Sequence, residues 1–191
     1  MKERNFLIKH SVKIEPNKVS LDGIDVLLSE RYNTFLSDIY HEKRLAYPKF
    51  FKMDILCKVG FLATEILLEA ENIERFVPRR DRSIIFCNKS SSVSTDLKFT
   101  HDILDLDNFY PKPSLFVYTL PNIVTGEIAI RNKYFGETNL FVMNDRDDNV
   151  ISELVEHALM DEEINSVVGG WIDAESENDY EADLCIFEIK Q

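Results

Sequence analysis

Apolar residues recur along this chain with two different periods, and the alternation of these periods predicts an α/β protein. In segment 55–73 they recur every three or four residues, which predicts a long, largely buried helix after the N-cap residue Asp54. Segment 83–88 is short and continuously apolar, as in a strand buried on both faces. Segment 6–14 alternates and predicts a first strand, whereas segment 20–40 suggests short helices.

Segment 114–148 joins a helix, a glycine turn, a strand and an acidic elbow without a linker. Pro121 opens the predicted helix, where its missing N–H group costs nothing. Gly126, inside that helix, suggests the close approach of another backbone, and Gly136 is typical of a left-handed helix cap. The apolar run Thr138-Asn139-Leu140-Phe141-Val142-Met143 predicts a strand.

The elbow, residues 144–149, contains no apolar side chain, and an amphipathic helix begins directly after it. Its aspartates lie where the helix dipole favours negative charge. Two closing strands are predicted at 165–171 and 184–189, separated by an acidic turn at 173–179. The order of elements is therefore helix, strand, elbow, helix, followed by the last strands.

These residues resemble the β-ketoacyl-acyl-carrier-protein synthases of the thiolase-like superfamily. In that family, a Pro-Asn-x-x-x-Gly-x-x-Ala-Ile helix precedes a glycine turn, a dimer-edge strand and an elbow that carries the nucleophilic cysteine. Segment 121–130 matches the helix, and Gly136 and the strand to Met143 match the next parts. Val168-Gly169-Gly170 resembles the strand and Gly-Gly turn beyond the elbow helix.

The chain departs from the family at the nucleophile. The family's threonine-alanine-cysteine-alanine elbow falls on Met143-Asn144-Asp145-Arg146, so Asp145 takes the position of the cysteine. The family's active-site histidines, or histidine and asparagine, come from a C-terminal half to which nothing here corresponds. Acyl transfer at such a site needs a thiolate and an acid/base pair, which an aspartate cannot replace.

The resemblance implies a three-layer α/β/α half of the thiolase-like fold with a mixed, mostly parallel sheet, in a single domain over residues 1–191. It implies a non-catalytic subunit, similar to a chain-length factor, in fatty-acid-like, polyketide or aryl-polyene biosynthesis. Two alternatives stay open, namely half of a split synthase and a fold retained as a binding or structural protein. No catalytic residue, metal or cofactor is expected.

The resemblance also implies the partners. Strand Thr138, Asn139, Leu140, Phe141, Val142 and Met143 would pair across a two-fold axis, in a homodimer or in a heterodimer with an intact ketosynthase. It lacks the lysine, proline or bulge of a solvent-exposed edge strand. The alternative is an interior strand that is already paired on both sides.

Composition and charge limit the classes of function. The chain has 191 residues, 45% of them hydrophobic, which is enough for one sizeable core. A net charge of −12 disfavours nucleic acid and anionic membranes as partners. Since no signal peptide or membrane span is visible, a cytoplasmic location is expected. Three widely spaced cysteines, Cys57, Cys87 and Cys185, are expected to be buried, reduced thiols.

The dense basic cluster of Arg79, Arg80 and Arg82 has two interpretations. The simpler one is a solvated loop. The more specific one is a contact with a phosphate group or with an acyl carrier protein, because arginine binds phosphate and carboxylate groups in a bidentate manner.

Overall fold

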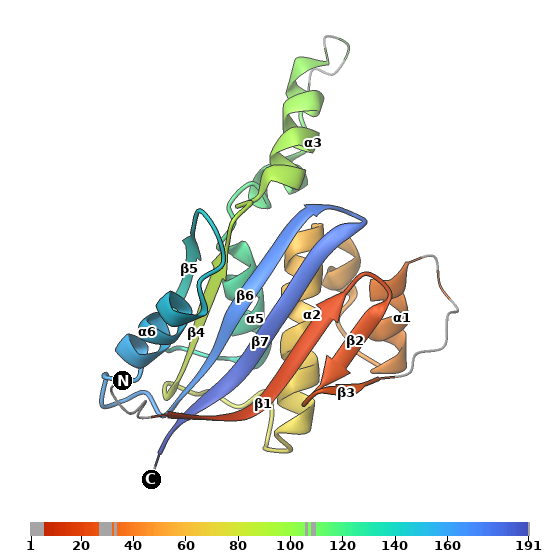
Figure 1. Ribbon diagram of the computed structural model, residues 1–191. Helices are drawn as coiled ribbons and strands as arrows, with labels where there is room; N and C mark the ends of the chain where they lie inside the picture. The colour runs from red at the N-terminus through yellow and green to blue at the C-terminus, as the bar shows by residue number, and fades with distance from the viewer. Residues whose placement is uncertain (1–5, 27–31, 33, 106, 108–109, 191) are drawn as a thin grey trace.

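The computed structural model describes residues 6–26, 32, 34–105, 107 and 110–190. Within these residues, the strands form one seven-stranded sheet in the order β3-β2-β1-β7-β6-β4-β5 (Figure 1). The strands are β1 (Phe6–Glu15), β2 (Lys18–Leu21), β3 (Ile24–Asp25), β4 (Arg82–Asn88), β5 (Thr138–Val142), β6 (Ser166–Ser176) and β7 (Asp179–Ile189).

The sheet is mixed, as expected, but the prediction that it is mostly parallel is wrong. Among the strands of the described residues, only β4 forms parallel pairs, with β5 on one side and β6 on the other. The pairs β1–β2, β2–β3, β1–β7 and β6–β7 are antiparallel. The hairpins β1–β2, β2–β3 and β6–β7 have connections of two residues, which can join only antiparallel strands.

Helices cover both faces of the sheet and give the three layers that were predicted (Figure 1). One face carries α1 (Phe35–Glu42), the short 3-10 helix η1 (Pro48–Lys52), α2 (Ile55–Ala70) and α5 (Ile123–Asn132). The opposite face carries α6 (Asp148–Ala158), which packs on β4 and β6. Helices α3 (Val93–Leu104) and α4 (Pro113–Val117) project beyond the sheet as an arm.

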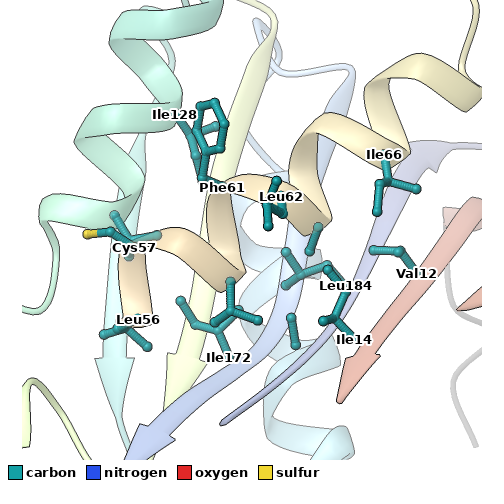
Figure 2. Close-up of a cluster of buried hydrophobic side chains, with 14 of the residues drawn as sticks. Val12, Ile14, Leu56, Cys57, Phe61, Leu62, Ile66, Ile128, Ile172 and Leu184 are labelled. Carbon is teal, nitrogen blue, oxygen red and sulfur yellow. The ribbon is translucent and has the colours of Figure 1, made fainter. Parts of the chain in front are cut away.

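The main core lies between α2 and the sheet (Figure 2). Leu62 and Ile66 of α2 are at most 1% exposed and face Val12 and Ile14 of β1 and Leu184 of β7. Asp54 caps α2, because its carboxylate accepts a hydrogen bond from the backbone N–H of Cys57. The predicted buried helix and its cap are therefore confirmed.

Several local predictions are wrong. Segment 20–40 contains the ends of a β-hairpin and only one described helix, α1; residues 27–31 and 33 lie outside the described part. Gly169 and Gly170 do not form a turn but lie inside β6, opposite Ile85 and Phe86 of β4. The closing strands extend through most of the predicted acidic turn and leave only two residues between β6 and β7.

The two glycines near α5 also have roles other than those predicted. Gly126 has no close neighbour, since a Cβ atom built on it would meet nothing within 4 Å. Gly136 is not the left-handed cap of α5, because Lys133 has that conformation, at φ 58° and ψ 41°. Gly136 is needed for another reason, since a Cβ atom there would lie 2.2 Å from the carbonyl oxygen of Arg82.

Candidate functional site

Strand β5 lies at the edge of the sheet. It pairs with β4 from Ile84↔Thr138 to Asn88↔Val142, and no other described strand lies on its far side. Phe141 is 36% exposed and Val142 is 54% exposed, whereas Leu140 packs against the main core. The alternative of an interior strand is therefore wrong, and a bare apolar edge of this kind is open to pairing.

The elbow begins where β5 ends. The backbone N–H of Met143 still donates to the carbonyl of Asn88, and α6 begins five residues later at Asp148. Asp147 is the N-cap, because its carboxylate accepts hydrogen bonds from the backbone N–H groups of Asn149 and Val150. The aspartate at the helix N-terminus is thus Asp147.

Asp145 lies two residues before that N-cap, so the expectation that it occupies the helix N-terminus is wrong. Its side chain is 82% exposed and accepts a hydrogen bond from Nζ of Lys89 at 2.8 Å. Arg146 closes the elbow, because it donates to Asp148 at 2.8 Å and to Asp183 of β7 at 2.9 Å. The elbow is a set of exposed ion pairs and contains no nucleophile of the thiol type.

Cys87 of β4 lies beside the strand that leads into the elbow, because it pairs in register with Phe141 of β5. It is fully buried against Ile151 of α6 and Trp171 of β6. Burial raises the pKa of the Cys87 thiol to about 11. A thiol of this kind is protonated at neutral pH and therefore lacks the thiolate that acyl transfer requires.

The other two thiols are also unsuited to catalysis. Burial raises the pKa of Cys57 well above its usual value and that of Cys185 to about 12. All three cysteines are unpaired, as expected, although Cys185 is only half-buried.

The four histidines are dispersed, and none supplies a base at the elbow. His10 of β1 contacts Asp22 at 2.8 Å, and His41 of α1 stacks on Tyr32 with ring centroids 3.9 Å apart. His101 belongs to the arm, and His157 to the last turn of α6. His157 is therefore separated from the N-cap by nearly the whole helix, roughly 15 Å at 1.5 Å per residue.

The structure divides the arginine cluster. Arg82 is 1% exposed and is bound by Glu71 and by Ser166, so its proposed contact with a carrier protein is wrong. Arg79 donates two hydrogen bonds to Asp81, at 2.9 and 2.8 Å. Arg80 is exposed, with its guanidinium 5.7 Å from the ring centre of Phe135. Of the three arginines of this cluster, Arg80 alone is exposed.

The arm of α3 and α4 was not anticipated from the sequence. Its base is fixed, because Thr95 donates to Asp54 at 2.8 Å and Ser92 donates to the carbonyl of Thr119 at 2.7 Å. Many of its large apolar side chains are exposed: Leu97, Ile103, Leu104, Phe116 and Val117 are each at least 42% exposed. Since four residues separate the end of β4 from the start of α3, the base of the arm lies near the carboxyl end of the β5 edge.

Comparisons with known proteins support the fold. Neither a scan of protein-family models nor a search of curated proteins gives a match. The ishigamide ketosynthase/chain length factor matches with a TM-score of 0.64 and 14% sequence identity, over 96% of this chain and 62% of that chain. The ketosynthase ApeO in complex with its chain length factor ApeC, from Xenorhabdus doucetiae, matches with a TM-score of 0.63 and 8% identity, over 98% of this chain and 80% of that one.

These likenesses show that the chain has the fold found in ketosynthase and chain length factor structures. The chain spans less than two thirds of the ishigamide protein that it matches. In the part that the structure describes, no helix is both long and apolar enough to cross a membrane.

Proposed function

We propose that this chain is a non-catalytic ketosynthase-like subunit that pairs through β5 with a second chain of the same fold. In this role it is similar to a chain-length factor beside an intact ketosynthase, in a fatty-acid-like, polyketide or aryl-polyene pathway. Residues 1–191 then form one domain that corresponds to the N-terminal half of a β-ketoacyl synthase. The observation that carries the proposal is the bare apolar edge of β5, followed by an elbow without a thiolate.

The elbow supports a non-catalytic role on chemical grounds. A synthase forms a thioester on its nucleophile, and Asp145 cannot form one. The buried thiols of Cys57 and Cys87 are protonated, and the half-buried Cys185 also has a raised pKa. A shared fold does not supply the missing chemistry.

The edge supports pairing on energetic grounds. A stable interface buries about 800 Å² on each partner, more than a five-residue strand provides. The arm carries exposed apolar side chains and projects beyond the sheet near the carboxyl end of β5 (Figure 1), so it can supply the remainder. Both neighbouring structures include a chain length factor, and the second holds a ketosynthase with its factor, which supports a heterodimer.

A weaker contact with an acyl carrier protein is part of the proposal. Of the arginines predicted to contact the carrier protein, Arg80 is exposed. Arg79 is 19% exposed and forms an ion pair with Asp81. The net charge of −12 opposes such docking elsewhere on the surface.

The test of the non-catalytic role is a condensation assay with acyl and malonyl thioesters of a carrier protein. We expect no product from the purified chain, and none from Asp145→Cys, because no histidine is near the elbow. A ketosynthase with an intact cysteine serves as the positive control. Condensation by the purified wild-type chain would refute the proposal.

A further inference from the structure

A hollow of about 350 Å³ lies where two hairpins and two helices meet. The β1–β2 connection, Pro16 and Asn17, and the β6–β7 connection, Glu177 and Asn178, form part of its wall. The first turns of α1 and α2 also line it, at the same end of the sheet as the two hairpin tips (Figure 1). Since ligand pockets typically measure about 300 Å³ or more, the hollow is large enough for a small molecule.

One part of the wall, here called the apolar wall, consists of Phe35, Leu36 and Ile55. Leu36 and Ile55 are 4% and 2% exposed and belong to the main core, and the half-buried Phe35 packs against it. Because these side chains are held by the core, the apolar wall is already formed in the empty hollow. It can cover the apolar body of a ligand.

Two polar side chains of the hollow lack a partner. Among the described residues, neither Nζ of Lys58 nor the hydroxyl of Tyr180 has a hydrogen bond or an ion pair. Lys58 is half-buried in the first turns of α2, with Nζ 6.0 Å from the ring centre of Phe50. Tyr180 is 7% exposed and belongs to the main core, as do Ala182 and Leu184 at alternate positions of β7, so its ring lies on the face that α1 and α2 cover. A buried hydroxyl without a partner is costly, so these two donors favour a ligand that carries an acceptor.

The amino end of α1 adds backbone donors to the same hollow. Thr34, the N-cap residue, accepts a hydrogen bond from the backbone N–H of Ser37. The N–H groups of Phe35 and Leu36 have no partner among the described residues, as is usual for the first turn of a helix. This end of the helix therefore favours a negatively charged group.

The charges of the wall match a single negative charge. Glu177 is the acid of the described wall, and its carboxylate is held by Nζ of Lys98 of α3 at 2.6 Å. Lys58 is the cation of that wall and has no counterion within the described residues. Burial and the nearby Glu177 raise the pKa of Tyr180 to about 12, so its hydroxyl is protonated and can donate.

We infer that this hollow binds a small monocarboxylate with an apolar body. The carboxylate lies between Nζ of Lys58 and the hydroxyl of Tyr180, and the body lies on the apolar wall. A dianion would bring more negative charge than Lys58 can match, and the net charge of −12 opposes it further. The inference goes beyond the proposed function and does not depend on pairing through β5.

Titration of the nitrogen-15-labelled full chain with 4-phenylbutanoate, followed by two-dimensional NMR, tests the inference. We expect the amide signals of Phe35, Leu36 and Asn178 to shift, with a Kd of about 0.1–1 mM for a ligand of this size. The neutral analogue 4-phenylbutanamide should bind about tenfold more weakly, because it cannot form a charged hydrogen bond with Lys58. This comparison uses the wild type alone, so it holds even if a variant is less stable.

Substitutions test the two donors separately. Lys58→Gln should weaken binding of 4-phenylbutanoate about tenfold, and Tyr180→Phe about threefold. Lys52→Gln is the matched control, since Lys52 is an exposed lysine of η1 outside the hollow, and it should bind as the wild type does. Equal affinities of the wild type for the carboxylate and the amide, an unchanged affinity in Lys58→Gln, or shifts confined to residues outside the hollow would each overturn the inference.

Discussion

The guanidinium of Arg82 donates two hydrogen bonds to the carboxylate of Glu71, at 2.6 and 2.5 Å, and both side chains are 1% exposed. This pair joins the end of α2 to the start of β4, the strand that holds the β5 edge in the sheet. Nε of Arg82 donates to Ser166 of β6 at 2.8 Å, so the pair also joins β4 to β6. The position of the edge therefore depends on a buried charge pair.

Glu71→Ala should strongly destabilise the fold, because it leaves the Arg82 cation buried without its partner. The expected loss is about 3–5 kcal/mol in the free energy of unfolding, measured by urea titration. Glu69→Ala is the control, since Glu69 is 56% exposed and its ion pair with Lys43 contributes at most about 1 kcal/mol. Equal losses of unfolding free energy in the two variants would show that the buried pair stabilises the fold no more than an exposed pair does.

Two glycines should respond in opposite ways to alanine. Gly126→Ala should stabilise the protein by up to about 1 kcal/mol, because α5 gains helix propensity and the added Cβ meets nothing. Gly136→Ala should destabilise it, because the Cβ would collide with backbone atoms of Arg82 that cannot easily move. Thermal unfolding of both variants measures the contrast, and a Gly136→Ala protein as stable as the wild type would contradict the close packing of Gly136 against Arg82.

The sequence predicted the elements whose signals are local. Helix α2 has a capping aspartate and a continuous apolar stripe, and β4 and β5 are short apolar runs, so their positions agree with the structure to within a few residues. The extension of β6 and β7 was missed because acidic residues such as Glu181 and Asp183 occupy the half-buried positions that alternate with buried ones in β7. A segment in which acidic and apolar residues alternate resembles an acidic turn in sequence. Only its pairing with β6 shows that it is a strand.

The candidate site was less predictable, because it depends on contacts between distant residues. Arg82 appeared to be part of an exposed basic cluster, and only its pairing with Glu71 and Ser166 makes it a core residue. Whether β5 lies at an edge is a property of sheet order, which its own residues do not encode. The arm was missed because apolar side chains such as Leu97 and Leu104 normally indicate burial within the same chain.

The native thiols should react slowly with iodoacetamide at pH 7.5. Burial raises the pKa of Cys87 to about 11 and that of Cys185 to about 12, so very little thiolate is present. Mass spectrometry of the intact protein should show full alkylation only after unfolding in urea. Rapid modification of a single cysteine in the native chain would contradict this expectation. It would indicate a reactive thiol that could serve as a nucleophile.

The Arg79–Asp81 pair should contribute stability that depends on pH. Hydrogen bonds from Arg79 lower the pKa of Asp81 to about 2, below the value of about 3.9 in an unfolded chain. Its contribution is therefore complete above about pH 4 and is lost as the pH falls toward 2. The difference in unfolding free energy between wild type and Asp81→Asn should shrink from pH 5 to pH 2.5. A constant difference would contradict the pairing, and since Asp81 is 35% exposed, the effect should stay within about 1 kcal/mol.

Pairing through β5 is the central claim, and co-purification with an intact ketosynthase from the same genome tests it most directly. The tagged wild-type chain should retain the co-expressed ketosynthase in equal amounts. Phe141→Lys and Val142→Lys should lose it, because a charge on the bare edge opposes strand pairing. Phe51→Lys, at a phenylalanine that is 52% exposed on η1, is the matched control and should retain the partner. Retention by both β5 variants, or no retention by the wild type, would contradict the account.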